Sequence, residues 1–318
     1  MSRRLRTFLA TGMIAVLVTP LLAASGAEDP EHPGLPEPPA RATEGGIVSQ
    51  GIAQAARTRQ WIRLPRLDLV AYVPSQQTQK DPSCRSFPPY QEVQAWHAYT
   101  YVASPAGAPE PYGYSPSFTV RALAFGAVPV EVRLRLEQTR DADGLPEAWE
   151  LDVPNKTFCP GRGPHAGPTQ TEQHTPPASF AGSVSVAVES VRVDGLDLAV
   201  ASSCRTIAAT PLRLSSRDLY SRDPDLRPGE GALDWDPNTA RFFNGPGGGL
   251  LEGMVDIPAF TGCSTPDDDL DALLTGLVSA KDNPISVRAG QLTTDCLPWR
   301  YTEGCFVTSP MPLPVKDD

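Results

Sequence analysis

The side chains that most resemble a site for chemistry are the carboxylates of DADGLPEAWE, residues 141–150. Ca2+ is held by a ring of oxygen ligands around a bend that a glycine permits. In a twelve-residue loop of this kind, the ligand positions fall on Asp141, Asp143, the Leu145 carbonyl, Glu147 and Glu150. Thr139 stands where the first aspartate is expected and the motif occurs once, so the spacing predicts a weak Ca2+ site at best.

The same stretch has a second interpretation, as the tight turn of a β-hairpin. Asp143 and Gly144 lie between an apolar alternation that ends near Glu137 and another that resumes at Trp149 to Val153. An Asp-Gly pair between two such alternations is typical of a hairpin turn. The hairpin is the favoured interpretation, and it needs no bound ion.

The sequence contains no motif of an established catalytic class. GYSPS at residues 113–117 lacks the second glycine of a nucleophile elbow, and H-E-x-x-H is missing. His97 is the one histidine in a stretch of strand-forming residues, and it is a candidate base or a structural residue. Spacing does not exclude a carboxylate pair brought together in space, so an extracellular hydrolase stays as an alternative.

Two of the five tryptophans are candidates for ligand contact. Trp235 and Trp299 lie in segments rich in proline and aspartate, where an aromatic ring could stack on a sugar. Trp61 and Trp149 lie in strand-like patterns and are expected in the core. A glycan-binding module is therefore a further alternative.

The six cysteines indicate disulfides because no pair has the spacing of a metal site. They are Cys84, Cys159, Cys204, Cys263, Cys296 and Cys305. Spacing alone favours a bridge from Cys263 to Cys296, which would close a loop of about 33 residues and stabilise the fold by roughly 3 to 4 kcal/mol. Cys204 would then pair with Cys159 or Cys84.

The N-terminus predicts export. Arg3, Arg4 and Arg6 precede an apolar run that ends in small residues, so residues 1–27 are expected to be a secretory signal peptide. No second apolar stretch is long enough to span a membrane. The 37 acidic residues outnumber the 27 basic ones, and this negative charge makes nucleic acid an unfavourable partner. The expected protein is therefore secreted, and its ligand, on the cell wall or another surface, is unknown.

Residues 28–50 combine prolines with scattered charge and predict a disordered tether. The remaining chain, 51–318, alternates apolar and polar residues in many short stretches, clearest at Val130 to Leu136. An Asp-Gly turn at 194–195 predicts another hairpin. The expected fold is all-β, a mainly antiparallel β-sandwich with long irregular loops, as one large domain or two small ones divided within 156–182.

One short helix is expected near 266–277. Thr265 would cap it, Pro266 suits its first position, and four leucines from Leu270 to Leu277 share one face. The four aspartates among residues 267–271 resemble a metal cluster. Carboxylates in a first helical turn are also stabilised by the free amides of that turn, and this capping role is the preferred interpretation.

Two segments resemble a group of secreted actinobacterial proteins of unknown function. The resemblance rests on VRVDGLDLAVASSCRT within residues 186–206, and on IPAFTGC, LDALLT and the closing Cys296 within residues 247–296. Ser264 and the SAKDN stretch depart from the group's pattern. The resemblance implies export and a β-rich fold, and it implies no activity. A non-catalytic binding or structural role outside the cell is the function that the sequence predicts.

Overall fold

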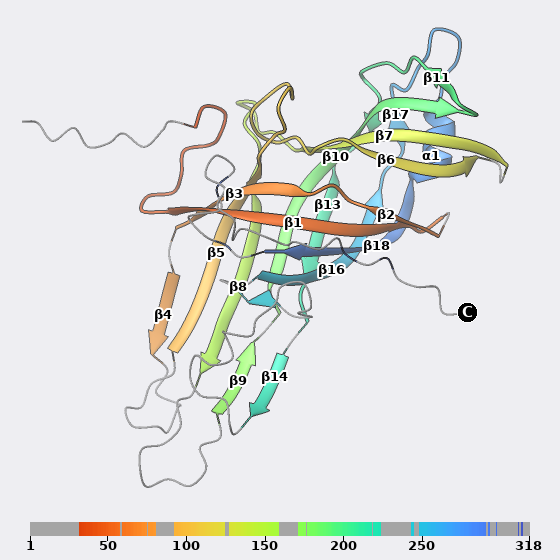
Figure 1. Cartoon of the computed structure of the whole chain (residues 1–318). Helices are drawn as coiled ribbons and strands as arrows, with labels where there is room; N and C mark the ends of the chain where they lie inside the picture. The colour runs from red at the N-terminus through yellow and green to blue at the C-terminus, as the bar shows by residue number, and fades with distance from the viewer. Residues whose placement is uncertain are drawn as a thin grey trace, which may run out of the picture. The chain divides into compact units, whose positions relative to one another are not determined.

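The alternating stretches of the sequence form antiparallel strands. The computed structural model describes residues 32–57, 59–74, 76–80, 92–124, 127–158, 171–175, 177–217, 219–223, 243–244 and 248–290, with single residues 292, 297, 311 and 313. All described strand pairs are antiparallel, and the described residues contain one helix (Figure 1). The prediction of a mainly antiparallel β fold with one short helix is therefore confirmed.

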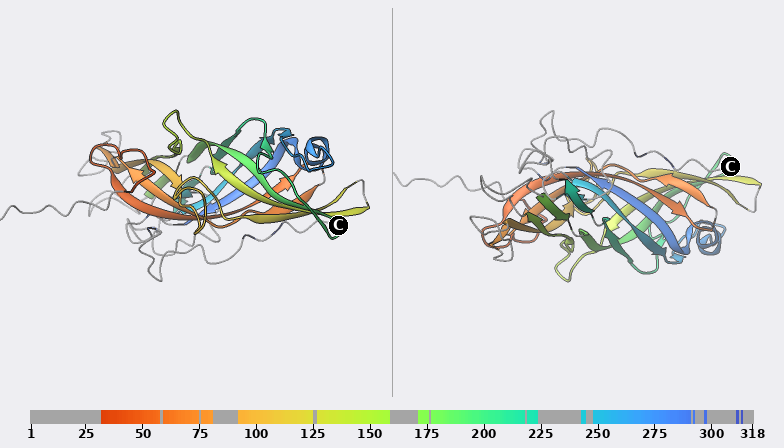
Figure 2. Two further views of the ribbon diagram at one scale, coloured as in Figure 1. Left: turned by 90° about the horizontal axis from the view of Figure 1, so that it is seen from above. Right: turned by 90° about the horizontal axis from the view of Figure 1, so that it is seen from below.

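Eight strands pair in a closed ring. In the order of pairing they are β10 (Ser179–Val193), β13 (Thr210–Ser215), β16 (Gly248–Ile257), β18 (Ala280–Ala289), β1 (Thr43–Ala55), β3 (Leu67–Val73), β5 (Glu92–Val102) and β8 (Trp149–Phe158). β8 pairs again with β10, which closes the ring. The layers expected of a sandwich are thus continuous around one interior, as the two views of Figure 2 show.

The other strands extend this ring at its edges and ends. They are β2 (Gln60–Arg63), β4 (Gln76–Lys80), β6 (Phe118–Ala124), β7 (Val128–Gln138), β9 (Thr171–Thr175), β11 (Leu196–Leu198), β12 (Arg205–Thr206), β14 (Leu219–Asp223), β15 (Phe243–Asn244) and β17 (Phe260–Thr261). β7 pairs with β10 from Val184 to Val193, and β6 pairs with β7. β2 pairs with the end of β1.

The hairpin β10–β11 confirms the prediction made from the Asp-Gly pair at 194–195. Asp194 and Gly195 both have positive φ, 47° and 81°, as a two-residue hairpin turn requires. Val193 pairs with Leu196 directly across that turn. β10 also shifts its register against β7 between Val188 and Ser190. This irregularity explains why the buried valines before Glu189 have even numbers, whereas Val191 after it is buried at an odd one.

One prediction about chain organisation is wrong. Residues 28–50 were expected as a tether, yet β1 begins at Thr43, and Ile47 and Val48 are buried. This stretch carries few apolar residues, but strands β3 and β18 flank it and cover them. Residues Gly34–Asp318 form one compact unit, which agrees with the single-domain alternative, and β10 begins within 156–182 and pairs with both β8 and β13.

The helix is shorter than expected. α1 spans Asp271–Val278 and begins five residues after Pro266, with Leu274 and Leu277 buried as predicted. Thr265 does not cap it; its hydroxyl accepts hydrogen bonds from the Asp267 and Asp268 amides in a separate turn. The predicted helix start is wrong because this hydroxyl-centred turn competes with the first helical turn.

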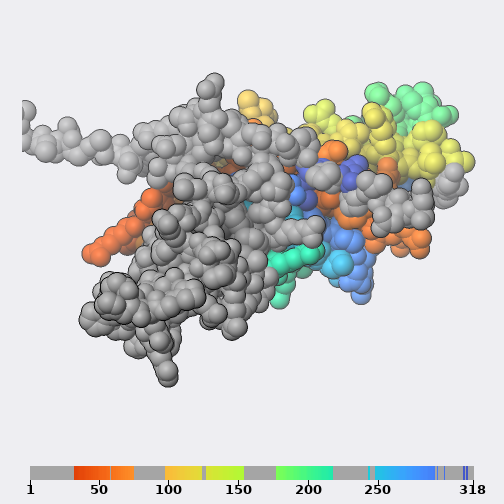
Figure 3. Space-filling view, turned by 60° about the horizontal axis from the view of Figure 1, so that its bottom comes forward, coloured from red at the N-terminus to blue at the C-terminus, as the bar shows by residue number. Residues whose placement is uncertain are grey.

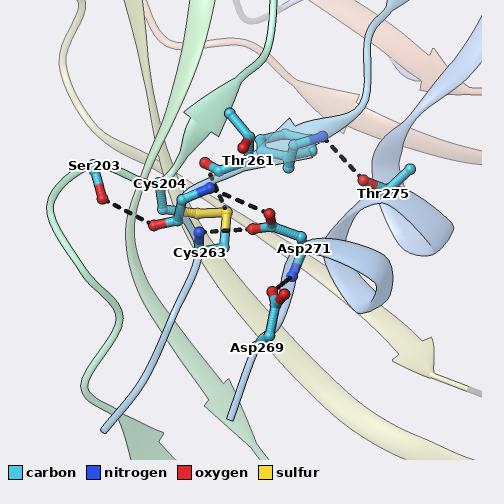
Figure 4. Close-up of a disulfide and its surroundings, with 9 residues drawn as sticks. Ser203, Cys204, Thr261, Cys263, Asp269, Asp271 and Thr275 are labelled. Atoms are coloured by element: carbon cyan, nitrogen blue, oxygen red, sulfur yellow. Dashed lines mark hydrogen bonds between the residues drawn. A yellow bond between two sulfur atoms is a disulfide. The ribbon is translucent and has the colours of Figure 1, made fainter.

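The expectation that all four aspartates lie in the first helical turn is wrong, since only Asp271 does; Asp269 and Asp271 instead accept hydrogen bonds from backbone amides. The Asp271 carboxylate accepts from the Cys263 amide at 2.7 Å and the Gly262 amide at 3.3 Å (Figure 4). Asp269 accepts from the Asp271 amide at 2.9 Å. Their role is to fix the chain ahead of α1.

The cysteine pairing differs from the prediction. Cys263 bonds to Cys204, with Cα atoms 4.2 Å apart, and both residues are fully buried (Figure 4). The predicted Cys263–Cys296 bridge is therefore wrong, as is the pairing of Cys204 with Cys159 or Cys84. Strands β12 and β17 hydrogen-bond directly beside the two cysteines, and this long-range pairing is invisible in the spacing. Cys84, Cys159, Cys296 and Cys305 lie outside the described residues.

Candidate functional site: an apolar cavity inside the ring

The strand ring encloses a cavity of about 140 Å3. Every one of the eight ring strands contributes to its wall, mostly through every second residue. On β13, for example, Thr210, Leu212 and Leu214 line it. Side chains of a strand alternate between faces, so the sequence alternation alone places these residues on the inner face.

The cavity wall is apolar at nearly every position. Of its 26 lining residues, the polar ones are Ser49, Thr100 and Thr210. The Thr100 hydroxyl donates to the Trp149 carbonyl at 2.9 Å. The Thr210 hydroxyl is buried and has no hydrogen-bond partner among the described residues. A buried hydroxyl without a partner is rare and unfavourable, which marks Thr210 as a place where a bound molecule could donate or accept.

The cavity is energetically unfavourable for the empty protein. Core voids cost about 24 cal/mol for each Å3, so 140 Å3 corresponds to about 3 kcal/mol. Protein interiors otherwise pack as densely as organic crystals. Apolar cavities of about this size in other proteins stay dry and accept a molecule such as benzene. The geometry therefore suits binding of a small apolar group.

Trp149 forms part of the wall and is held rigidly. Its indole Nε1 donates to the Ser183 carbonyl at 2.9 Å, and its ring packs edge-on against Phe180 at 5.7 Å. Gly182 lies against the indole, and a Cβ there would come within 2.2 Å of it. Trp149 is thus a core residue, as expected, and an intrinsic fluorescent reporter for the cavity.

Residues 139–147 form a tight turn. The Asp141 carboxylate accepts hydrogen bonds from the Asp143 and Leu145 amides, both at 2.9 Å, and Gly144 has a φ of 81°. The Asp141 amide donates to the Leu145 carbonyl, and the Glu147 amide to the Thr139 carbonyl. These bonds are the reversal that the hairpin interpretation predicts. The strands on either side of this turn, β7 and β8, form no described pairing with each other, because each of them pairs with β10.

The same residues do not fit a bound Ca2+. The Arg140 guanidinium donates to the Gly144 carbonyl at 2.6 Å, which puts a cation at the loop. Glu147 accepts from the Thr139 hydroxyl, and Glu150 lies on β8. Over the described residues, no three or more His, Cys, Asp or Glu side chains gather in a way that could hold a metal ion.

His97 lies on the outer face of the ring. Its Nδ1 is 2.6 Å from the Asp152 carboxylate on the neighbouring strand, and its ring packs edge-on against Tyr99 at 4.6 Å. In the described part of the chain, no serine, threonine or cysteine hydroxyl or thiol hydrogen-bonds to it. The cross-strand contact accounts for the residue structurally.

The serines of the GYSPS stretch also have structural partners. Ser115 is buried, donates to the Pro116 carbonyl and accepts from the Leu136 amide. Ser117 donates to Glu189, whose carboxylate is also bound by Arg133 and Arg135. The hydroxyls of both serines are therefore engaged in contacts within the fold.

The sequence did not reveal which residues form the cavity. The predicted ligand residues Trp235 and Trp299 lie outside the described part of the chain. The only available signal was the period-two alternation, which identifies inward-facing residues. Alternation does not show whether the inward-facing side chains of opposite strands fill the space between them, because this depends on how the ring of strands closes.

No helix among the described residues is long and apolar enough to cross a membrane. Comparison with known proteins adds no assignment: no family model, no curated protein and no solved structure matches this chain.

Proposed function

We propose that this chain is an exported, non-catalytic binding protein whose ring cavity holds a small apolar molecule, or the apolar part of a larger one. The observation that carries the proposal is the 140 Å3 cavity with its almost wholly apolar wall. Export is supported by the signal-like N-terminus and by the Cys204–Cys263 bridge, since disulfides persist mainly in oxidising compartments.

The Thr210 hydroxyl adds a polar preference to this site. It lies in the wall at the start of β13, opposite Val184 of β10, and lacks a partner in the described structure. A ligand with one hydroxyl can satisfy it. Phenol should therefore gain affinity from Thr210, whereas toluene, of similar shape, should not.

Toluene titration with thermal unfolding and calorimetry tests the proposal. The parent protein should bind toluene and unfold at a higher temperature in its presence, because the ligand binds the folded state. Val184→Phe places a larger side chain in the cavity and should abolish this shift. Val188→Phe, on the same strand but packed with Val130 and Val132 outside the cavity wall, is the matched control and should retain it.

Thr210→Val separates the polar preference from cavity binding. This variant should bind toluene like the parent and lose its preference for phenol. A parent protein that binds neither compound, or a Val184→Phe variant that binds toluene as tightly as the parent, would overturn the proposed function.

A further inference from the structure

The cavity has one stretch of wall where strand pairing is interrupted. β6 pairs with β7, and β2 pairs with β1, but no described pairing joins β2 to β6. Both strands lie at the end of the ring that carries α1 (Figure 1). We call this line between Gln60–Arg63 and Phe118–Ala124 the seam.

Three spaces lie in series across the seam. An open groove on the outside is lined in part by Gln60 and Ala122. These two residues also line a small void of about 10 Å3, whose other walls include Ile62 and Val278. Ile62 and Val278 in turn line the large cavity. Neighbouring spaces thus share side chains in their walls, and these shared side chains mark out a path from solvent towards the cavity.

The narrow point of this path can widen at small energetic cost. A void of about 10 Å3 is near the size of one water-sized probe, so it admits no ligand as it stands. Separating β2 from β6 breaks none of the backbone hydrogen bonds of the described pairings. β2 has only four residues, all at least partly exposed. Segments with few buried contacts open most readily.

The groove at the outer end of the path is positively charged. Arg59 and Arg121 line it together with the single acid Glu131, whereas the whole chain has a formal net charge of −10. Arg121 pairs with Glu131, but its side chain is 76 % exposed, and exposed ion pairs are easily exchanged. Leu123, 57 % exposed, adds an apolar contact beside them. Figure 3 shows the surfaces of β6–β7 and β1–β2 at the same end of the molecule.

We infer that the ligand is a small amphiphile with an anionic head, which enters through the seam. Its apolar tail occupies the cavity, and its carboxylate or phosphate head stays at the groove, where Arg59 and Arg121 bind it. This inference rests on the proposed function, because the tail needs the cavity. It adds the chemical class of the ligand, its orientation and its route.

Calorimetry with three eight-carbon probes tests the head-group contact. Octanoate and octyl phosphate carry anionic heads, and octanol is their neutral match. The parent should bind the anionic probes more tightly than octanol, and the ratio of the two anions identifies the preferred head. In Arg59→Ala/Arg121→Ala, affinity for the preferred anion should fall roughly tenfold, the size expected for loss of charge-assisted hydrogen bonds.

A control variant removes the same charge elsewhere. Arg213→Ala/Arg217→Ala changes two exposed arginines on or directly after β13, and it should leave all three affinities unchanged. Octanol affinity should stay the same in both double variants. Equal losses in the two double variants would reduce the effect to net charge and would overturn the head-group assignment.

The entry route is tested by rate. Quenching of Trp149 fluorescence by 8-bromooctanoate, followed by stopped flow, measures how fast a tail reaches the cavity, and Trp149→Phe identifies the signal of that residue. Ala122→Phe narrows the seam and should slow association at least about tenfold, because a narrow path limits the rate more than the equilibrium. Ala181→Phe, on the exposed face of β10, is the matched control.

Gln60→Phe narrows the seam from its opposite side and replaces Ala122→Phe if that variant does not fold. An unchanged association rate in a folded seam variant would overturn the route. If toluene binds, but the arginine variant keeps its affinity for the anionic probes and the seam variants keep their association rate, the proposed function stands and this inference falls. If toluene does not bind, the proposed function itself falls.

Discussion

At the scale of single residues, the outer side of the ring carries a second buried layer built on tyrosines. Tyr72, Tyr101 and Tyr112 pack with Leu35 and Val70, and the rings of Tyr72 and Tyr101 lie edge to face at 5.8 Å. Burial raises the pKa of Tyr101 to about 12, with a smaller contribution from Tyr99 and Asp141. Burial, followed by the Glu44 charge, also raises the pKa values of Tyr72 and Tyr112.

These tyrosines predict a loss of stability in alkali. Below about pH 10, the ordinary tyrosine pKa, both folded and unfolded chains keep the phenolic proton and stability is unaffected. Between about pH 10 and 12 the unfolded chain releases it first, so the free energy of unfolding falls by up to about 1.4 kcal/mol per pH unit for each tyrosine. Urea unfolding across this range measures the fall. Tyr101→Phe should make it shallower, and parallel curves would contradict the assignment.

At the scale of elements, Gln138 at the end of β7 joins this strand to β5 and to the turn that precedes β8. Its side chain accepts from the Val102 amide at 3.0 Å, and donates to the Thr100 carbonyl at 3.1 Å and the Glu147 carbonyl at 2.7 Å. It is buried, and it lies where β7 ends and the chain enters the tight turn at 139–147. These three bonds tie the end of β7 to β5 and to the turn that leads into β8.

Gln138→Ala should therefore destabilise the fold by about 3 kcal/mol, because it leaves buried amide and carbonyl groups unpaired. Chemical denaturation of the variant measures this difference. Gln54→Ala is the control, since its side chain makes an exposed 3.4 Å bond to the Arg59 carbonyl and its loss should cost under about 0.5 kcal/mol. Similar losses in the two variants would show that Gln138 is not a junction.

At the scale of the whole molecule, two features constrain the chain between distant segments. The ring closes through three residue pairs between β8 and β10, and the disulfide joins positions 59 residues apart. The disulfide fastens the β12–β17 pairing and, through Asp271, the start of α1. α1 in turn contributes Val278 to the cavity wall. Closure of the ring and placement of the helix together define the cavity.

Removing the bridge with Cys204→Ala/Cys263→Ala should lower the free energy of unfolding by about 4 kcal/mol, because a loop of 59 residues is released in the unfolded chain. Denaturation curves of the oxidised parent and the variant provide the measurement. Peptide mapping without reductant checks the connectivity, and a peptide that joins Cys263 to Cys296 would contradict the structure.

The sequence by itself determined the all-β class and the inward face of the strands with clear alternation, such as β7, because alternation is a local property of the chain. It also predicted the Asp-Gly hairpin at 194–195 and the apolar face of α1, which depend on neighbours a few residues apart. The start of β1, the partner of Cys263 and the single compact unit were decided by pairings between remote segments. The cavity belongs to the tertiary structure alone, since an unfilled space exists only after eight strands have closed around it.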